Sequence, residues 1–579
     1  MPELLSGADE ETPAVARPAA GVSSRSPGAG FAAVGRWARS HALALTGTPL
    51  AAIVLFTLYL HQARTAPLNG DGAGNALQAW DMLHGNLLLS HWSVSDVSFY
   101  FTELPEYMLV EAVHGLNGDV VHIAAALTYT LAVLLACWLA RGRARGAEAA
   151  VRVLIVLVVM LAAPARGTGV VIELDSPDHF GTAVPLLVFF LALERLPRRR
   201  FTPVLLFLLL VWAGSSDTTA IFLGGGALAV ICATRLWQGK GRRRYEASLL
   251  AVAVLAAGVA IEVPRVIARL GGFTMHRPDM AFNAAADMPN AVWQSVSAFL
   301  ELFGANFFGL SVAGPSSGGA GVPGETVFAL LHLFGAGLVV AALIKTVRRL
   351  RDGGREDAGG DGTGGVGSGG DEGGGTGRDR IAELLTVGIL LNLAALVFST
   401  QYRGWAREIA AVLPLAAVVA ARVLAGRMTH RKHVALLGAF ATVFAAVLAY
   451  HATGPSQPPY AHRVEAWLKQ HGYTSGIGGY WTSHSITVGS GGAIQVSPVN
   501  TGPAGIQAYD WESKSTWYDP RQRSANFLVV DLANPSALQY ARPQQAIKQF
   551  GPPARVVPIG GWEVMIWDKN LLADLPGSN

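Results

Sequence analysis

The sequence predicts a polytopic α-helical membrane protein followed by a small α/β domain. Three observations indicate this class: the composition is apolar, stretches long enough to cross a bilayer recur along the chain, and basic residues gather between them. Hydrophobic residues make up 51% of the 579 residues and charged residues only 15%, with a mean hydropathy of +0.36. Such a composition is too apolar for a soluble protein of this length.

The positions of the charged residues along the chain are more informative than the net charge, which is only +4. Lysines and arginines lie in short runs between apolar segments, as they do in cytoplasmic loops of membrane proteins. A nucleic-acid-binding protein would collect them on one folded surface, so we expect no nucleic-acid partner. The two cysteines, Cys137 and Cys232, both fall in apolar segments, and neither a disulfide framework nor a zinc site follows from them.

Residues 1–40 are rich in Pro, Gly, Ala and Ser and predict a disordered cytoplasmic tail. The first apolar run starts too late for a cleavable signal peptide. Residues 41–451 are expected to hold about eleven transmembrane helices, because a crossing takes roughly 20 apolar residues. The expected segments are 42–62, 119–140, 151–165, 179–194, a two-helix hairpin over 201–236 that turns around Ser215 to Asp217, 247–264, 325–345, 381–399, 408–425 and 433–450.

The positive-inside rule orients these segments in a plasma membrane, with the N-terminus in the cytoplasm and the C-terminus outside. Basic runs follow 119–140 and 179–194, precede 247–264 and close 325–345. Residues 291–312 are also apolar, but a crossing there would invert a neighbouring segment. Glu301 and Asn306 within it argue against a simple span as well. We therefore expect an interfacial or re-entrant element on the outer side.

Two further regions differ in composition from the apolar segments. Residues 352–379 are a Gly/Asp tract that predicts a flexible cytoplasmic linker; a phosphate-binding loop would need GxxxxGK[ST] after a strand. Residues 455–579 predict an extracytoplasmic α/β domain, with helices in HRVEAWLKQHG and ALQYARPQQAIKQFG and strands in AIQVSPV, NFLVVDL and RVVPIGGWEVMIWD. Its stretch GGYWTSHSITVGSGG is either a sugar-binding loop or an ordinary glycine-rich connection.

Asp71 is the first of three candidate groups in the outer loops. It follows the first segment at the point where the chain leaves the lipid, so its carboxylate would meet both water and a lipid headgroup. We interpret Asp71 as the acid/base of a membrane enzyme. The alternative is that it caps the helix predicted over AGNALQAWDMLHG.

The second group lies in the loop VVIELDSPDHFG, before the segment 179–194. Hard oxygen ligands suit Mg²⁺ or Mn²⁺, so we assign Glu173, Asp175 and Asp178 as metal ligands and His179 to substrate binding. The alternative is that Ser176 or Asp178 caps the following helix.

The third group contains Tyr402, Arg403 and Arg407, near Trp405 and Glu408. Arg403 and Arg407 stand in or beside an outer loop, against the charge rule. Arginine binds phosphate through a bidentate fork, so we assign these three residues to substrate binding. The alternative for Arg407 is an ion pair with an acidic neighbour in the outer loops. Glu103, Glu106 and Glu111 rank lower as candidates.

The stretch DGAGNALQAWDMLHG resembles the first-loop signature of the GT-C superfamily of polyprenyl-phosphate-sugar glycosyltransferases, in its protein mannosyltransferase and aminoarabinose transferase branch. That branch opens with Asp-Glu and ends in A-x-x-M-L-x-G. Asp71 matches the Asp and Gly72 stands in place of the Glu; the tail is matched by Ala79, Met82, Leu83 and Gly85. Three other stretches are similar to family features, namely ELPEYMLVEAVHGLNGD, the loop with Glu173 and Asp175, and the arginines Arg403 and Arg407. The resemblance covers about residues 45–200 and, more loosely, 380–450.

The resemblance implies an inverting transfer on the outer face of the membrane, from a polyprenyl-phosphate sugar to a glycan, lipid or protein acceptor. Asp71 would accept the proton of the acceptor hydroxyl, and Arg403, Arg407 or a metal would stabilise the phosphate leaving group. The alternatives are a transporter or flippase of lipid-linked sugars, or a scaffold with an inert membrane part. Convergence of the three groups on one site would favour the enzyme.

Overall fold

The computed structural model describes residues 47–165, 172–276, 281–305, 325–356, 379–400, 406–534 and 541–576. The chain divides into Met1–Ile53 and Val54–Asn579. The described part of the first unit is helical and belongs to the apolar helix Gly47–Ala63. The other elements described below lie within the second unit.

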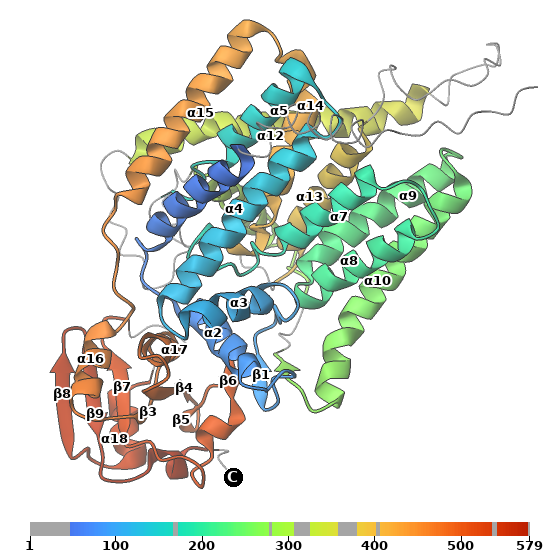
Figure 1. The fold of residues 1–579 in the computed structure, drawn as a ribbon. Coiled ribbons are helices and arrows are strands. Elements are labelled where there is room, and N and C mark those ends of the chain that lie inside the picture. The colour runs from blue at the N-terminus through green and yellow to red at the C-terminus, as the bar shows by residue number, and fades with distance from the viewer. Residues whose placement is uncertain are drawn as a thin grey trace, which may run out of the picture. The chain divides into compact units, whose positions relative to one another are not determined.

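Helices dominate the second unit up to residue 452 (Figure 1). Apolar segments fold as helices because a helix pairs its backbone N–H and C=O groups within the segment, whereas lipid offers these groups no hydrogen-bond partners. The longer helices are α4 (Asp119–Arg141), α5 (Gly146–Met160), α7 (Ala183–Arg195), α8 (Thr202–Ser216), α9 (Ala227–Trp237), α10 (Arg243–Arg269), α11 (Met288–Leu302), α12 (Glu325–Glu356), α13 (Arg380–Phe398), α14 (Val412–Leu424) and α15 (Arg431–Ala452).

The chain is a multi-pass membrane protein by the length and composition of these helices. Among the described residues, five helices are long and apolar enough to cross a bilayer, namely Asp119–Arg141, Arg243–Arg269, Val327–Asp352, Arg380–Phe398 and Arg431–Ala452. Shorter apolar helices are Gly47–Ala63, Thr202–Ser216 and Ile221–Trp237. The predicted total of about eleven crossings stays a prediction, as do the orientation of the termini and the domain boundaries.

The outer element predicted over 291–312 corresponds to α11, which has 15 residues and packs against α13. That length falls short of the roughly 20 residues of a crossing. Residues 306–312 lie outside the described part of the chain, and so does most of the Gly/Asp tract 352–379.

Two short helices, α2 (Gly70–Leu83) and α3 (Glu103–His114), follow the first apolar helix and pack against each other. Helix α3 buries Leu104 and Tyr107 and exposes the apolar side chains of Leu109 and Val113. Between them lies β1 (Trp92–Val94), the centre of a three-stranded sheet with β2 (Thr274–Met275) and β6 (Ser513–Lys514). This sheet ties three remote parts of the chain together.

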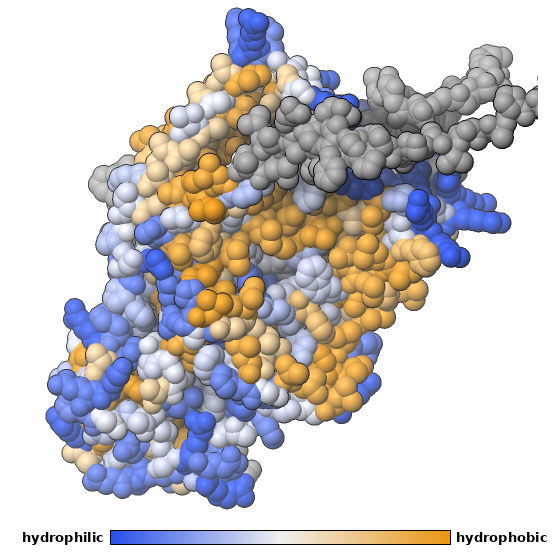
Figure 2. Space-filling model, viewed as in Figure 1, coloured by the Kyte–Doolittle hydropathy of each residue, from blue (hydrophilic) through white to orange (hydrophobic). Residues whose placement is uncertain are grey.

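The C-terminal residues form a six-stranded sheet in the order β5-β4-β3-β7-β9-β8. The neighbouring strands β4, β3 and β7 are parallel, and antiparallel strands flank them, with β5 on one side and β9 and β8 on the other. The strands are β3 (Ser475–Gly478), β4 (Gln495–Gly502), β5 (Gly505–Ala508), β7 (Phe527–Asp531), β8 (Arg555–Ile559) and β9 (Trp562–Ile566), with helices α16 (His462–Gln470), α17 (Tyr480–Gly489) and α18 (Pro543–Phe550). Figure 2 shows apolar residues over the membrane helices and mainly polar residues over this sheet.

The interpretation of GGYWTSHSITVGSGG as a loop is wrong, because Tyr480–Gly489 is the helix α17. Hydroxyl side chains usually disfavour helix interiors, but here they bond back to the preceding turn. Ser483 Oγ donates to the Gly479 carbonyl and Thr487 Oγ1 to the Ser483 carbonyl, each at 2.9 Å. The helix is buried between β4 and the start of α2, which brings the C-terminal sheet against the first loop.

Candidate active site

Helix α2 places Asp71 in its first turn. Asn69 is the N-cap, and its Oδ1 accepts from the Gly72 amide at 2.7 Å. The alternative that Asp71 caps this helix is therefore wrong. The Asp71 side chain is 24% exposed, and a carboxylate in the first turn is stabilised by the helix dipole.

Arg407 lies beside Asp71, although most of the chain separates the two residues in sequence. A 3₁₀ turn (Ala406–Ile409) carries it. Its Nη1 donates to Asp71 Oδ2 at 2.9 Å, and its Nη2 donates to Asp178 Oδ2 at 2.7 Å and to Ser176 Oγ at 2.8 Å. Burial lowers the pKa of Arg407, but the charges of Asp71 and Asp178 outweigh burial and raise it. Arg407 is thus a fixed cation that joins Asp71 to the loop 173–179, as its ion-pair alternative predicts.

Asp178 is buried and fully engaged. Its Oδ1 accepts from Asn75 Nδ2 at 2.8 Å, and its Oδ2 accepts from Ser176 Oγ at the same distance. Burial raises the pKa of Asp178, and Arg407 partly opposes this. The alternative that Ser176 or Asp178 caps the next helix is wrong, because α7 begins at Ala183 after Thr182.

Asp175 is buried beside the same group, and Asn69 Nδ2 donates to its Oδ2. Burial raises the pKa of Asp175 to about 7, even though Arg407 and Asn69 lower it. Glu173 is buried elsewhere, and the charge that acts on it is that of Glu301 in α11.

The structure thus does not bring Glu173, Asp175 and Asp178 together as a ligand set. Within the described ranges, no group of three or more His, Cys, Asp or Glu is arranged to hold a metal ion. One oxygen of Asp175 and both oxygens of Asp178 already accept hydrogen bonds from amide and guanidinium groups. The Mg²⁺ or Mn²⁺ assignment stays a prediction.

His179 lies next to this group in a left-handed backbone conformation, with φ of +58°. Its Nδ1 is 3.3 Å from Asp217 Oδ2, and its Nε2 is 3.7 Å from Glu408 Oε2. Burial lowers the pKa of His179, but Glu408 and Asp217 outweigh burial and raise it to about 10. The ring is therefore a second cation beside the carboxylates. Tyr402 and Arg403 lie outside the described residues.

Two residues of the site escaped the sequence analysis, Tyr480 in α17 and Glu512 next to β6. Tyr480 Oη lies 2.8 Å from Asp71 Oδ1 and 2.6 Å from Glu512 Oε2. No local pattern marks them, since the signal is a contact between opposite ends of the chain. Asp217, expected only as part of a polar turn, is also part of the site: it faces His179 and accepts from Thr182 Oγ1 at 2.8 Å.

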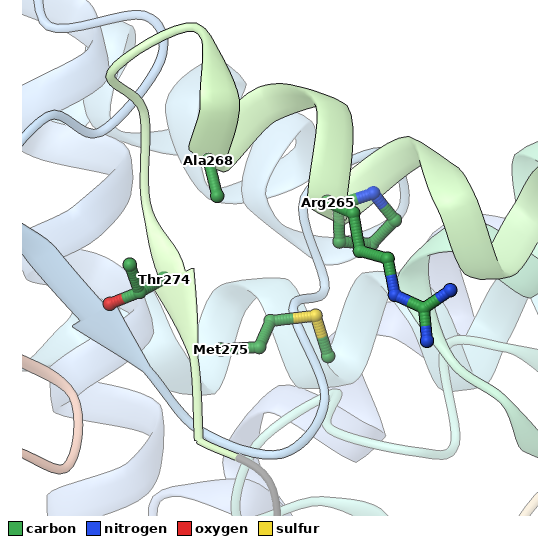
Figure 3. Close-up of a pocket in the computed structure, with 5 residues that line it drawn as sticks. Arg265, Ala268, Thr274 and Met275 are labelled. Atoms are coloured by element: carbon green, nitrogen blue, oxygen red, sulfur yellow. The ribbon is translucent and has the colours of Figure 1, made fainter.

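The arrangement can accept a proton at one place. Asp71 is the most exposed carboxylate in this network of Asp71, Asp175, Asp178 and Arg407, and both its oxygens are oriented by donors. A separate pocket of about 310 Å³, lined by Pro264, Arg265, Ala268, Thr274 and Met275, lies between α10 and β2 (Figure 3). Its lining shares no residue with this network.

No family model matches the chain, and no curated protein matches it. Solved structures do match. ArnT from Cupriavidus metallidurans in the apo state has 14% identity and a TM-score of 0.38, over 90% of this chain and 98% of that one. ArnT bound to undecaprenyl phosphate has the same identity and TM-score, over 89% and 97%. The arabinofuranosyltransferase AftD from mycobacteria has 15% identity and a TM-score of 0.34, over 92% of this chain and 40% of that one.

Proposed function

We propose that this chain is a membrane glycosyltransferase that moves a sugar from a polyprenyl-phosphate donor to an acceptor hydroxyl, with inversion and with Asp71 as the general base. The observation that carries the proposal is the meeting of Asp71, Asp178 and Arg407 at one partly exposed carboxylate. Three segments remote in sequence supply these residues. A scaffold function does not require these charged residues to come together.

The distribution of arginines supports a site on the outer side of the membrane. Arginines lie at the ends of α4, α7, α10 and α13 that are remote in sequence from the site loops, namely Arg141, Arg195, Arg243 and Arg380. By the positive-inside rule these ends face the cytoplasm, so the site faces outward in a plasma membrane. Nucleotide sugars are absent there, and an activated sugar must arrive on a lipid phosphate.

In the proposed reaction, the acceptor oxygen attacks the anomeric carbon while Asp71 takes its proton. The bond from that carbon to the phosphate oxygen breaks, and the lipid phosphate leaves with the electron pair. Arg407 orients Asp71 and places positive charge beside it, while His179, Tyr402 and Arg403 are proposed to bind the donor. No step is assigned to a metal, because amide and guanidinium groups bond to one oxygen of Asp175 and to both oxygens of Asp178.

The test uses purified protein with polyprenyl phosphates that carry different sugars, and host membranes as the source of acceptor. We expect sugar transfer with at least one donor, and a loss of roughly 100-fold or more in Asp71→Asn. Asp119→Asn is the matched control, since Asp119 also pairs with an arginine, Arg64, outside the site. A folded Asp71→Asn protein with full transfer activity would refute the base. Movement of lipid-linked sugars across proteoliposomes without any product would instead support the flippase alternative.

A further inference from the structure

The hydroxyl of Tyr480 lies between two carboxyl groups, those of Asp71 and Glu512. Both contacts, at 2.8 and 2.6 Å, have the length of an O–H···O hydrogen bond. A phenol carries one hydrogen, so Tyr480 can donate in only one of them. The other contact needs a hydrogen that a carboxyl group supplies, because two bare oxygens at this distance repel each other.

Glu512 is the group that carries this hydrogen. Asp71 is partly exposed and already accepts a hydrogen bond from the charged Arg407 guanidinium on its other oxygen. Glu512 is 2% exposed, and the guanidinium of Arg407 is directed to Asp71, Ser176 and Asp178 instead. Burial, followed by the charge of Asp71, accordingly raises the pKa of Glu512 well above its ordinary value.

The fold holds Glu512 in place from the C-terminal side. Glu512 directly precedes β6, which pairs with β1 through Trp92 and Lys514. Lys514 Nζ also lies 2.9 Å from Asp81 Oδ2 in α2. Glu512 itself has a φ of +48°, a left-handed conformation that side chains other than glycine adopt only when their surroundings impose it.

Helix α2 leaves a matching space for the carboxyl group. A Cβ atom at Gly74 would lie 2.2 Å from Glu512 Oε2 and 3.2 Å from its Cβ. Any side chain at position 74 would therefore displace Glu512 from Tyr480. Gly74 belongs to the same DGAG stretch as Asp71, so one turn of α2 carries the carboxylate and admits the group that acts on it.

On the basis of the proposed function, we infer that Glu512 is a positioning residue for the transfer: as a neutral acid it donates to Tyr480, and so directs the one phenolic hydrogen to Asp71. Asp71 is then held as an oriented carboxylate by Tyr480 on one oxygen and Arg407 on the other. An ionised Glu512 would take that hydrogen for itself. The C-terminal part of the chain thereby acts on the base without touching substrate.

The kinetic test compares Glu512→Gln, Glu512→Ala and Tyr480→Phe. The amide of glutamine can donate to Tyr480 as the neutral acid does, so Glu512→Gln should keep kcat within about threefold. Glu512→Ala and Tyr480→Phe should lower kcat by roughly 10- to 100-fold, as expected for a lost hydrogen bond to a charged group, with KM for the donor unchanged. Asp531→Ala is the matched control, because Asp531 at the end of β7 is another carboxyl group that accepts from a tyrosine, Tyr460; it should leave kcat unchanged.

Gly74→Ala provides a second test that leaves Glu512 itself unchanged. Alanine favours a helix more than glycine does, so the substitution does not weaken α2 through propensity. It should lower kcat as Glu512→Ala does, because the new methyl group displaces the carboxyl. Full kcat in Gly74→Ala, Glu512→Ala and Tyr480→Phe, with Asp71→Asn inactive, would overturn this inference and leave the proposed function standing.

Infrared difference spectroscopy tests the hydrogen on Glu512 without substrate or activity. The wild-type minus Glu512→Gln spectrum of the purified protein should contain the C=O stretch of a protonated carboxylic acid. A carboxylate band in its place shows that Glu512 is ionised and overturns the inference. Because this readout needs no turnover, it stands even if Asp71→Asn proves active and the proposed function fails.

Discussion

Nη1 of Arg407 lies 2.9 Å from Oδ2 of Asp71, and these two residues come from loops that follow different membrane helices. The other terminal nitrogen of Arg407 is bonded to Asp178, which is buried. The guanidinium therefore bridges an exposed carboxylate and a buried one. This contact defines the site and makes Arg407 both a structural and a functional residue.

Arg407→Ala should lower both stability and activity. It would leave the buried Asp178 carboxylate without its cation, and removal of one partner of a buried ion pair costs about 3–5 kcal/mol. We expect a lower Tm and a loss of transfer of roughly 100-fold or more. Arg407→Lys keeps the charge but not the planar fork, so its Tm and its transfer activity should lie between those of the wild type and those of Arg407→Ala. The control is Arg64→Ala, which breaks a half-exposed pair with Asp119 and should change stability by only about 0–1 kcal/mol. Equal Tm values for both alanine variants would contradict the bridge.

The pair of His179 and Asp217 should make stability depend on pH. Because the pKa of His179 is raised to about 10 in the folded protein, the stabilisation is complete below its ordinary value of roughly 6.5 and is lost as the pH rises through 10. The pKa of Asp217 is lowered overall: burial raises it, but bonding to His179 outweighs burial. The stabilisation of the fold by Asp217 is therefore complete above the ordinary pKa of an aspartate, and it is lost as the pH falls through the lowered pKa.

We expect the Tm of His179→Gln to lie below that of the wild type near pH 7, with the difference shrinking as the pH approaches 10. Thermal unfolding in detergent at several pH values measures this difference. His462→Gln, which replaces an exposed histidine at the start of α16, should not change the pH dependence. A difference between His179→Gln and the wild type that stays constant from pH 7 to 10 would show that the histidine is not charged in the fold.

Gly70→Ala should loosen the contact between α2 and α17. The added Cβ would lie 2.9 Å from Trp481 Cε3 and 3.2 Å from its Cα, and the backbone atom cannot rotate away. Overpacking of this kind costs about 1–3 kcal/mol. We expect a lower Tm and faster proteolysis of the C-terminal part. Gly258→Ala in α10 meets no atom within 4 Å and should have no such effect.

Arg422→Ala should separate stability from catalysis. Arg422 joins Glu194 at 2.5 Å and Asp379 at 2.7 Å, at the arginine-rich ends of the helices. Its loss would leave Glu194, which is mostly buried, unpaired, so we expect a marked decrease in Tm. KM for the donor should not change, since neither acid contacts Asp71 or Arg407 in the described part of the chain. A large rise in KM at unchanged Tm would contradict this assignment.

The membrane part of the fold could be predicted because its signal is local. Each apolar run and each basic cluster can be identified in a window of about 20 residues, and the helices begin and end near the predicted segments. Helix α17 could not be predicted from its glycines and hydroxyl residues, because its burial against α2 and β4 and the back-bonds of Ser483 and Thr487 to the preceding turn are visible only in the structure. Such tertiary context overrides a weak propensity.

The same limit applies to the site. Asp71, Asp178 and Arg407 could be predicted as candidates because of their local sequence. Asp71 follows the first apolar segment, Asp178 belongs to an acidic outer loop, and Arg407 departs from the positive-inside rule. Tyr480 stands in the stretch GGYWTSHSITVGSGG, whose composition does not indicate which of its residues would act, and Glu512 has no local signal. Only the contacts around Asp71 place these two residues in the site. The role of the DGAG glycines could not be predicted from the sequence either, because a glycine in a helix does not indicate which atom of another segment lies against it.

The space beside Gly74 has a consequence for engineering. The first loop and the C-terminal part are complementary in shape where Gly74 faces Glu512. Exchange of only one of these two regions between related enzymes should therefore disrupt the contact. A chimera that takes its opening helices from one parent and its terminal sheet from another should assemble in the membrane yet turn over slowly. Activity should return when the two regions are transplanted as a matched set.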